Sequence, residues 1–133
     1  MELQYEFKGN HFIASYLDCN FAALTDIKGL KKAMETAVLS SGATILNMVD
    51  HQFDPNGYTS AYILSESHAT IHTYPEHKSC FVDLFTCGDH CSYEKFDHVL
   101  CQYLNPKSVK YEVIKRATDM KFTTCLDVPT ASK

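Results

Sequence analysis

Helical spacing of apolar residues is confined to two stretches of this 133-residue chain. In 24–42, Leu30, Met34 and Val38 recur at helical intervals, Thr25 or Asp26 can cap the start, and Gly42 can end the helix. A similar spacing returns in 92–104. The other apolar stretches are short and typical of strands: 11–19, 44–53, 58–65, 68–74, 79–87 and 108–116. The resulting order, β-α-β-β-β-β-α-β, predicts the α+β class. We expect a two-layer sandwich, with two helices packed on one face of a mainly antiparallel sheet.

Turn chemistry and alternation sharpen this prediction in the middle of the chain. Pro55, Asn56 and Gly57 are turn-forming residues, so the runs on either side of them are expected to pair as a hairpin. Alternation in 68–74 separates the polar side chains, which include His68 and His72, from apolar ones on the opposite face. These histidines are therefore expected on one face of a strand.

Composition excludes several classes of function. The length fits one domain over 1–133, and the net charge of -4 with scattered basic residues argues against a nucleic-acid partner. No apolar run approaches 18 residues, and the N-terminal residues lack a signal-peptide pattern. We therefore expect a cytoplasmic protein with no membrane contact and free thiols among its six cysteines. The tail, 117–133, has no periodicity and is expected to be loosely held.

The segment "LSESHATIHTYPE" (64–76) concentrates reactive side chains, and zinc binding is the first chemistry to consider. His68 and His72 share a strand face, but four residues of strand separate them by roughly 13 Å, too far for one ion. Cys87, His90 and Cys91 lack the paired short spacings of a four-ligand structural zinc site. No metal site is predicted.

Two further chemistries remain open for the same segment. A serine hydrolase is possible in principle, but the chain lacks a G-x-S-x-G turn to present Ser67. Self-cleavage is the other, because the Ser67 hydroxyl can attack the preceding carbonyl of Glu66 and convert the amide to an ester. That reaction requires a strained backbone and a nearby base. The residues allow self-cleavage without singling it out.

Two sequence blocks carry a resemblance to a known family. "SESHATIHTYPE" (65–76) followed by "VDLFTCG" (82–88) closely resembles the prokaryotic, short-chain S-adenosylmethionine decarboxylases, which depend on a pyruvoyl group. Weaker similarity extends over about residues 8–116. The resemblance implies decarboxylation of S-adenosylmethionine to S-adenosylmethioninamine for spermidine and other polyamines.

The resemblance also implies how the chain processes itself. Cleavage between Glu66 and Ser67 would give a β chain of 1–66 and an α chain of 67–133, with Ser67 converted to the pyruvoyl cofactor. His72 matches the histidine that assists processing. Thr59 stands where the family usually carries a serine with the same task.

Further matches concern the decarboxylation itself. The pyruvoyl ketone would form a Schiff base with the substrate amine and accept the electrons released by decarboxylation. Cys87 matches the proton donor to the resulting carbon. Phe53 and Tyr74 match the residues that sandwich the adenine, and Glu76 matches the acid that holds the ribose hydroxyls. The family further implies a homodimer of processed protomers, with active sites at the interface.

One departure from the family pattern leaves alternatives open. Ser15 stands where the family commonly has an acidic residue. A pyruvoyl-dependent ornithine or arginine decarboxylase on the same scaffold is one alternative, although such substrates have no adenine or ribose. A non-catalytic regulatory homologue is another, although the serine, histidine and cysteine of the family motifs are all present.

Overall fold

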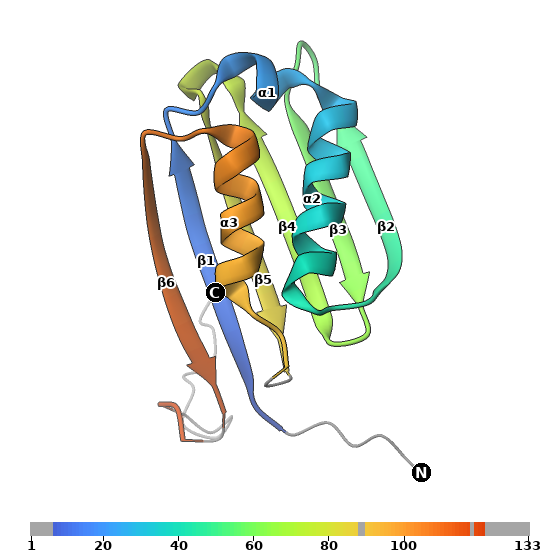
Figure 1. Ribbon diagram of the computed structural model, residues 1–133, viewed down its shortest axis with the longest axis vertical. Coiled ribbons are helices and arrows are strands. Elements are labelled where there is room, and N and C mark those ends of the chain that lie inside the picture. The colour runs from blue at the N-terminus through green and yellow to red at the C-terminus, as the bar shows by residue number, and fades with distance from the viewer. Residues whose placement is uncertain (1–6, 88–89, 118, 122–133) are drawn as a thin grey trace, which may run out of the picture.

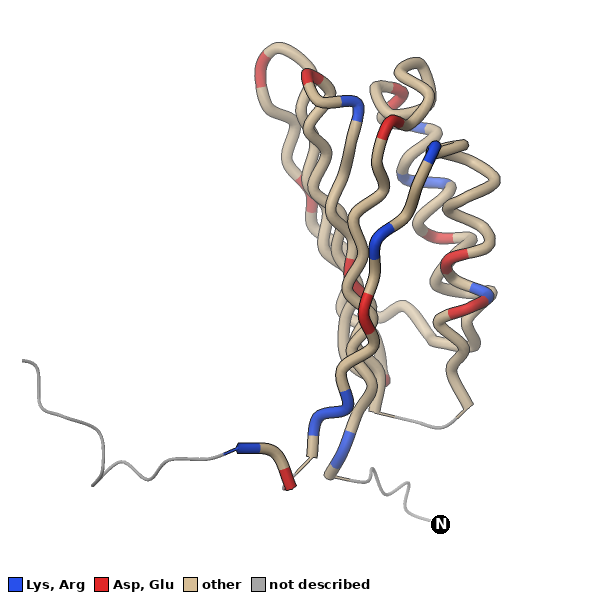
Figure 2. Tube along the Cα trace, turned by 90° about the vertical axis from the view of Figure 1, so that its left-hand side faces the viewer, with Lys and Arg blue, Asp and Glu red and all other residues tan. Residues whose placement is uncertain are grey.

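The structure, a computed structural model, describes residues 7–87, 90–117 and 119–121. Its six strands form one antiparallel sheet in the order β2-β3-β4-β5-β1-β6. The strands are β1 (Gly9–Leu17), β2 (Ile45–Gln52), β3 (Tyr58–Leu64), β4 (Ser67–Tyr74), β5 (Ser79–Thr86) and β6 (Ser108–Arg116). The helices are α1 (Phe21–Thr25), α2 (Ile27–Ser41), α3 (Tyr93–Leu104) and the short 3-10 helix η1 (Pro75–His77). Helices α2 and α3 cover one face of the sheet (Figure 1), and the side view shows two layers (Figure 2). The predicted α+β sandwich is confirmed.

The helix expected over 24–42 is capped as predicted, but a separate short helix precedes it. The chain forms α1, leaves helical geometry at Asp26 (φ −86°, ψ 97°), and then enters α2. The Asp26 side chain accepts the backbone N–H of Gly29 at 3.1 Å and so caps α2. The predicted start, with Thr25 or Asp26 as the cap, is therefore confirmed, whereas the separate short helix α1 before it was not predicted. The end of α2 is as expected, since Gly42 adopts a left-handed conformation (φ 101°) there.

The hydrophobic core lies between the helices and the covered face of the sheet. Its largest members are Phe12, Tyr16, Leu24, Leu30, Met34, Tyr58, Tyr62, Ile71, Leu84, Phe96, Leu100 and Leu104. Burying each aliphatic or phenylalanine side chain stabilises the fold by about 1.5–3 kcal/mol. Tyr16 also donates its hydroxyl to Asp97 at 2.6 Å and so ties β1 to α3. Burial beside Asp97 raises the pKa of Tyr16 far above its usual value, so the hydroxyl stays a donor.

The opposite face of the sheet, here called the open face, has no helix over it among the described residues. The strand register arranges its side chains in rows: Ile63, His68, Phe85 and His11; then Val49, Ala61, Thr70, Asp83 and Ile13; then Thr59, His72, Phe81 and Ser15. Three apolar members, Ile63, Val49 and Phe81, remain 50–66% exposed. The open face thus mixes exposed apolar residues with histidines and an aspartate.

Most element boundaries agree with the sequence. The predicted hairpin is β2-β3, the strand at 108–116 is β6, and the helix at 92–104 is α3 within one residue. Much of the tail, including 122–133, lies outside the described residues, so the expectation of loose holding there stays a prediction. No helix in the described part of the chain is long and apolar enough to cross a bilayer.

Candidate active site

The bond expected to be cleaved lies in the tight turn between β3 and β4. Ser65 and Glu66 form the turn, and Ser67 opens β4, paired with Leu64 on β3 and Thr86 on β5. Ser67 has a φ of 149°, a positive value that residues with a Cβ rarely adopt. The backbone is therefore strained on the C-terminal side of the Glu66–Ser67 peptide bond.

The carbonyl of the same peptide bond is held by a neighbouring strand end. The backbone N–H of Cys87, directly after β5, donates to the carbonyl oxygen of Glu66 at 3.0 Å. A fixed N–H donor stabilises negative charge that develops on a carbonyl oxygen under attack. The register that pairs Ser67 with Thr86 thus places an oxyanion-type donor on the bond preceding Ser67.

The side chain of Glu66 anchors the turn. One carboxylate oxygen accepts the backbone N–H of Thr44 at 3.1 Å, and the other lies 3.4 Å from Nε2 of His90. Burial alone would raise the pKa of Glu66, but hydrogen bonds from Ser65, Thr44 and His90 outweigh it, and the pKa is lowered. The Glu66 carboxylate is therefore ionised at neutral pH, and it fixes the turn from both sides. We call Glu66, Ser67 and Cys87 the cleavage end.

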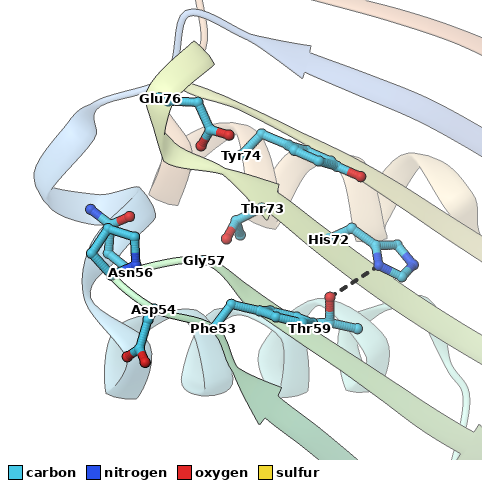
Figure 3. A pocket seen from close by; sticks show the side chains of 10 residues that line it. Phe53, Asp54, Asn56, Gly57, Thr59, His72, Thr73, Tyr74 and Glu76 are labelled. Atoms are coloured by element: carbon cyan, nitrogen blue, oxygen red, sulfur yellow. Dashed lines mark hydrogen bonds between the residues drawn. The ribbon is translucent and has the colours of Figure 1, made fainter.

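A cavity of about 540 Å³ lies at the opposite end of β3 and β4 (Figure 3). It is lined by Phe53, Asp54, Pro55, Asn56, Gly57, Thr59, His72, Thr73, Tyr74 and Glu76. The two aromatic rings are half exposed, Phe53 at 50% and Tyr74 at 40%. Glu76 stands at its edge in η1, beyond Tyr74. The cavity therefore offers two aromatic faces and a carboxylate, a set that suits a stacked base with hydroxyl groups beside it. We call these residues the pocket end.

His72 and Thr59 form a pair within the pocket end. They face each other across β3 and β4, with 3.1 Å between Oγ1 of Thr59 and Nδ1 of His72 (Figure 3). The contact leaves Nε2 of His72 as the ring nitrogen not engaged by Thr59. This pair is the natural candidate for a proton-transferring group on the open face.

The structure thus divides the predicted site residues into two groups. Phe53, Tyr74 and Glu76 gather at the pocket end with Thr59 and His72, whereas Ser67 and Cys87 lie at the cleavage end. His72 is five residues from Ser67 along β4, a separation of about 16 Å at the rise of a strand. Within one chain, His72 therefore does not reach the Glu66–Ser67 bond.

Asp83 lies between the two ends and has no counterpart among the residues singled out from the sequence. Both His11 and His68 direct Nε2 at its Oδ2, at 2.7 and 3.3 Å. No spacing pattern points to this contact, because the three residues belong to three strands and only the register brings them together.

Cys91 is distinct from Cys87, although both follow β5 closely. Burial, together with the charge of Glu66, raises the pKa of Cys91 to about 11. Its thiol is therefore protonated and a poor nucleophile at neutral pH. This supports the view that Cys87 is the thiol available for chemistry at this end.

Known proteins resemble this chain over nearly its whole length. Residues 10–117 match the family model described as S-adenosylmethionine decarboxylase. The chain belongs to the S-adenosylmethionine decarboxylase family. The S-adenosylmethionine decarboxylase proenzyme of Prochlorococcus marinus is 38% identical over 92% of this chain and 98% of its own length. That of Synechococcus is 44% identical over 72% of each chain.

A solved structure agrees with this assignment. The crystal structure of the adenosylmethionine decarboxylase from Aquifex aeolicus superposes with a TM-score of 0.78 at 28% identity, covering 90% of this chain and 98% of that one. The resemblance expected from the two sequence blocks is confirmed. Membership of the family makes the chain an enzyme that decarboxylates S-adenosylmethionine after self-processing, in polyamine biosynthesis.

Proposed function

We propose that the chain cleaves itself between Glu66 and Ser67 and that Ser67 becomes the pyruvoyl group of the decarboxylase. The proposal rests on the geometry around that one peptide bond. Its carbonyl oxygen already accepts the Cys87 N–H at 3.0 Å, and the residue after it has a strained φ of 149°. Charge stabilisation on the carbonyl and strain at the serine both favour attack by the serine hydroxyl.

The processing chemistry follows from these groups. Oγ of Ser67 forms a bond to the Glu66 carbonyl carbon, and the amide nitrogen leaves as an amine, which gives an ester. A base then removes the α-proton of Ser67, and the bond between Cβ and Oγ of Ser67 breaks, so that Oγ leaves with the bonding electrons as part of the new C-terminal carboxylate of Glu66. The enamine left on residue 67 tautomerises, and water releases ammonia and leaves the ketone. Only water is consumed, so no external oxidant is required.

The base for this step comes from the pocket end of a second copy of the chain. His72 lies about 16 Å from Ser67 of its own chain at the rise of a strand, and its Nδ1 is already engaged by Thr59. The open face carries exposed apolar residues, Ile63, Val49 and Phe81 among them, as an interface core requires. A two-fold dimer formed through the open faces brings the pocket end of one protomer to the cleavage end of the other.

The same arrangement gives each side chain a role in decarboxylation. The pyruvoyl carbonyl supplies the sink for the electrons that the departing carboxyl group leaves behind. Phe53 and Tyr74 stack on the adenine and attract the sulfonium through their ring faces. The Glu76 carboxylate accepts hydrogen bonds from the ribose hydroxyls, and the Cys87 thiol donates a proton to the substrate carbon. The product enters the synthesis of spermidine.

The cleavage site is tested by the mass of the purified protein. The unprocessed chain is 15.0 kDa, and cleavage before Ser67 produces two fragments, 1–66 and 67–133, the second of which begins with a pyruvoyl group. Ser67→Ala removes the hydroxyl and is expected to leave one intact chain without activity. Ser65→Ala, in the same turn, is the matched control and is expected to be cleaved. An intact wild-type chain with full activity, or a cleaved Ser67→Ala chain, would contradict the proposal.

A further inference from the structure

Two histidines and an aspartate meet on the open face, outside the roles assigned above. His11 comes from β1, His68 from β4 and Asp83 from β5. Their ligating atoms all lie within 4.8 Å of one another. Among residues 7–87, 90–117 and 119–121, no other group of three or more histidine, cysteine and acidic side chains converges in this way.

The two imidazoles are aimed at one carboxylate oxygen. Nε2 of His11 is 2.7 Å and Nε2 of His68 is 3.3 Å from Oδ2 of Asp83. The other oxygen, Oδ1, accepts a hydrogen bond from the hydroxyl of Thr70. The hydrogen bond from Thr70 to Oδ1 orients the carboxylate, so that Oδ2 points toward the two imidazoles. Outer-shell residues orient ligands in the same way in metal sites.

The chemistry of the three side chains suits a cation. A carboxylate supplies a negatively charged oxygen, and an imidazole binds a metal ion through a neutral ring nitrogen. In the single chain the side chains of His11, His68 and Asp83 are 18%, 41% and 21% exposed, so an ion can reach them from solvent before two open faces meet.

The surroundings limit how tightly an ion is held. The Phe85 ring lies beside both imidazoles, with ring centroids at 5.4 Å from His11 and 5.7 Å from His68. The Arg116 guanidinium lies over the same ring, 4.5 Å from its centroid. The Phe85 ring packs against the imidazole rings and restrains them, whereas the positive charge of Arg116 disfavours a cation bound nearby. These features indicate a site of moderate affinity.

We propose that Nε2 of His11, Nε2 of His68 and Oδ2 of Asp83 bind one divalent transition-metal ion, with water in the remaining position. Two imidazoles and one carboxylate with an open position suit Zn²⁺ and its neighbours in the first row better than Mg²⁺ or Ca²⁺. His68 directly follows Ser67, so the ion lies beside the start of the α chain. The proposal needs no cleavage and stands apart from the assignment of Ser67.

Titration of the full chain, stripped of metal with a chelator, tests this site. We expect Zn²⁺ to bind with a stoichiometry of one per chain by calorimetry. Co²⁺ is expected to give visible d–d bands of a nitrogen- and oxygen-ligated ion. Because outer-shell contacts alone change metal affinity by about 10–100-fold, loss of a ligand in His11→Ala is expected to weaken binding at least about 10-fold. His98→Ala, exposed on α3 in the other layer, is the matched control and is expected to bind as wild type.

Three results would overturn the proposal. Absence of Zn²⁺ binding shows that the three side chains form a hydrogen-bonded group only. Equal affinity in the wild type and His11→Ala places the ion elsewhere, as does a thiolate-to-cobalt charge-transfer band, which marks cysteine ligands. His11→Gln, which keeps a polar side chain of similar reach, is titrated in parallel in case the alanine variant unfolds. Repeating the titration with uncleaved Ser67→Ala separates failure of this site from failure of the proposed cleavage.

Discussion

The cleavage end and the pocket end of the open face are built in different ways. At the cleavage end the backbone sets the geometry of the bond to be cleaved, through the Glu66 carbonyl, the Cys87 N–H and the strained φ of Ser67. At the pocket end the working groups are side chains around a cavity of about 540 Å³. Backbone geometry depends on strand pairing, so substitutions act on the cleavage end mainly through the turn. At the pocket end, any change of side chain alters a group that lines the cavity.

The difference explains why two separated groups can serve one reaction. Making the cofactor requires a peptide bond held in a reactive geometry and a base, whereas recognising an adenosyl substrate requires rings and a carboxylate. Ser67 and His72 lie on the same strand, but about 16 Å of strand separates them. In the proposed dimer each end would therefore be half of a site, and a second chain would supply the other half.

Among substitutions that leave cleavage intact, removing the thiol of Cys87 is expected to have the largest effect on decarboxylation. Cys87→Ala keeps the backbone N–H that holds the Glu66 carbonyl, so cleavage should continue. Loss of a proton donor lowers a rate by about 10²–10⁴-fold, so we expect kcat to fall by at least about 100-fold. Single-turnover kinetics on the cleaved variant measure this.

The matched control is Cys91→Ala, which removes a nearby thiol with a raised pKa and should retain both cleavage and activity. If Cys87→Ala blocks cleavage but Cys91→Ala does not, then the thiol rather than the N–H acts in processing. Unchanged kcat in Cys87→Ala would exclude the thiol as the proton donor.

A substitution at the pocket end is expected to act on binding instead. Glu76→Gln removes the charge that accepts the ribose hydroxyls, and hydrogen bonds to charged groups contribute about 1.5–3 kcal/mol. We therefore expect KM to rise by about 10- to 100-fold, with cleavage unaffected. Steady-state kinetics and intact mass check both parts.

Glu94→Gln, on α3 in the helical layer, is the control for Glu76→Gln and should leave KM unchanged. Equal effects of the two substitutions would point to overall charge rather than to the ribose contact. A fall in kcat at constant KM would indicate that Glu76 acts in the chemical step rather than in substrate binding.

A mixed dimer tests whether the two ends come from different chains. Cys87→Ala and Glu76→Gln chains carrying different tags can be produced together and purified through both tags. If each site combines two chains, one site of every mixed dimer has both defects and the other has none. We expect about half of the wild-type activity at low substrate, against a tenth or less for either variant alone.

Activity of the mixed dimer that stays at the level of the two variants would show that each site is built within one chain. A monomeric mass for the wild type, measured by light scattering, would contradict the two-chain site outright. Subunit exchange is checked by separating the tags again after the assay.

The sequence predicted the strands, the β2-β3 hairpin and the face on which His72 lies, because each depends on local pattern. It also placed the cap of the helix at 24–42 at Thr25 or Asp26, as found, but it did not predict the short helix α1, whose five residues are too few to show a helical period. The bond from Cys87 to Glu66 and the meeting of His11, His68 and Asp83 depend on which strands are neighbours. Strand order is a property of the whole sheet, so short motifs carry no sign of it.

The smallest effect is expected at the carboxylate that anchors the turn. Glu66→Gln, made in the uncleaved Ser67→Ala chain, loses the ionised acceptor of the Thr44 N–H and the partner of His90. We expect the free energy of unfolding at pH 7 to fall by about 1 kcal/mol, less than is usual for a charged hydrogen bond, because His90 is exposed and the glutamine amide can still accept the Thr44 N–H. Urea unfolding measures the difference, and Glu112→Gln on β6 serves as an exposed control.

The pH dependence of this difference follows from the lowered pKa of Glu66. Burial opposes the shift, but the hydrogen bonds from Ser65, Thr44 and His90 keep the pKa in the folded state below the usual value of 4.5. The folded chain therefore holds fewer protons than the unfolded chain between these two values, so stability falls as the pH is lowered. The difference between Glu66 and its glutamine variant should be full above about pH 4.5 and shrink as the pH drops through the folded pKa. A difference that stays constant down to pH 3 would show that the side chain anchors the turn through its shape rather than its charge.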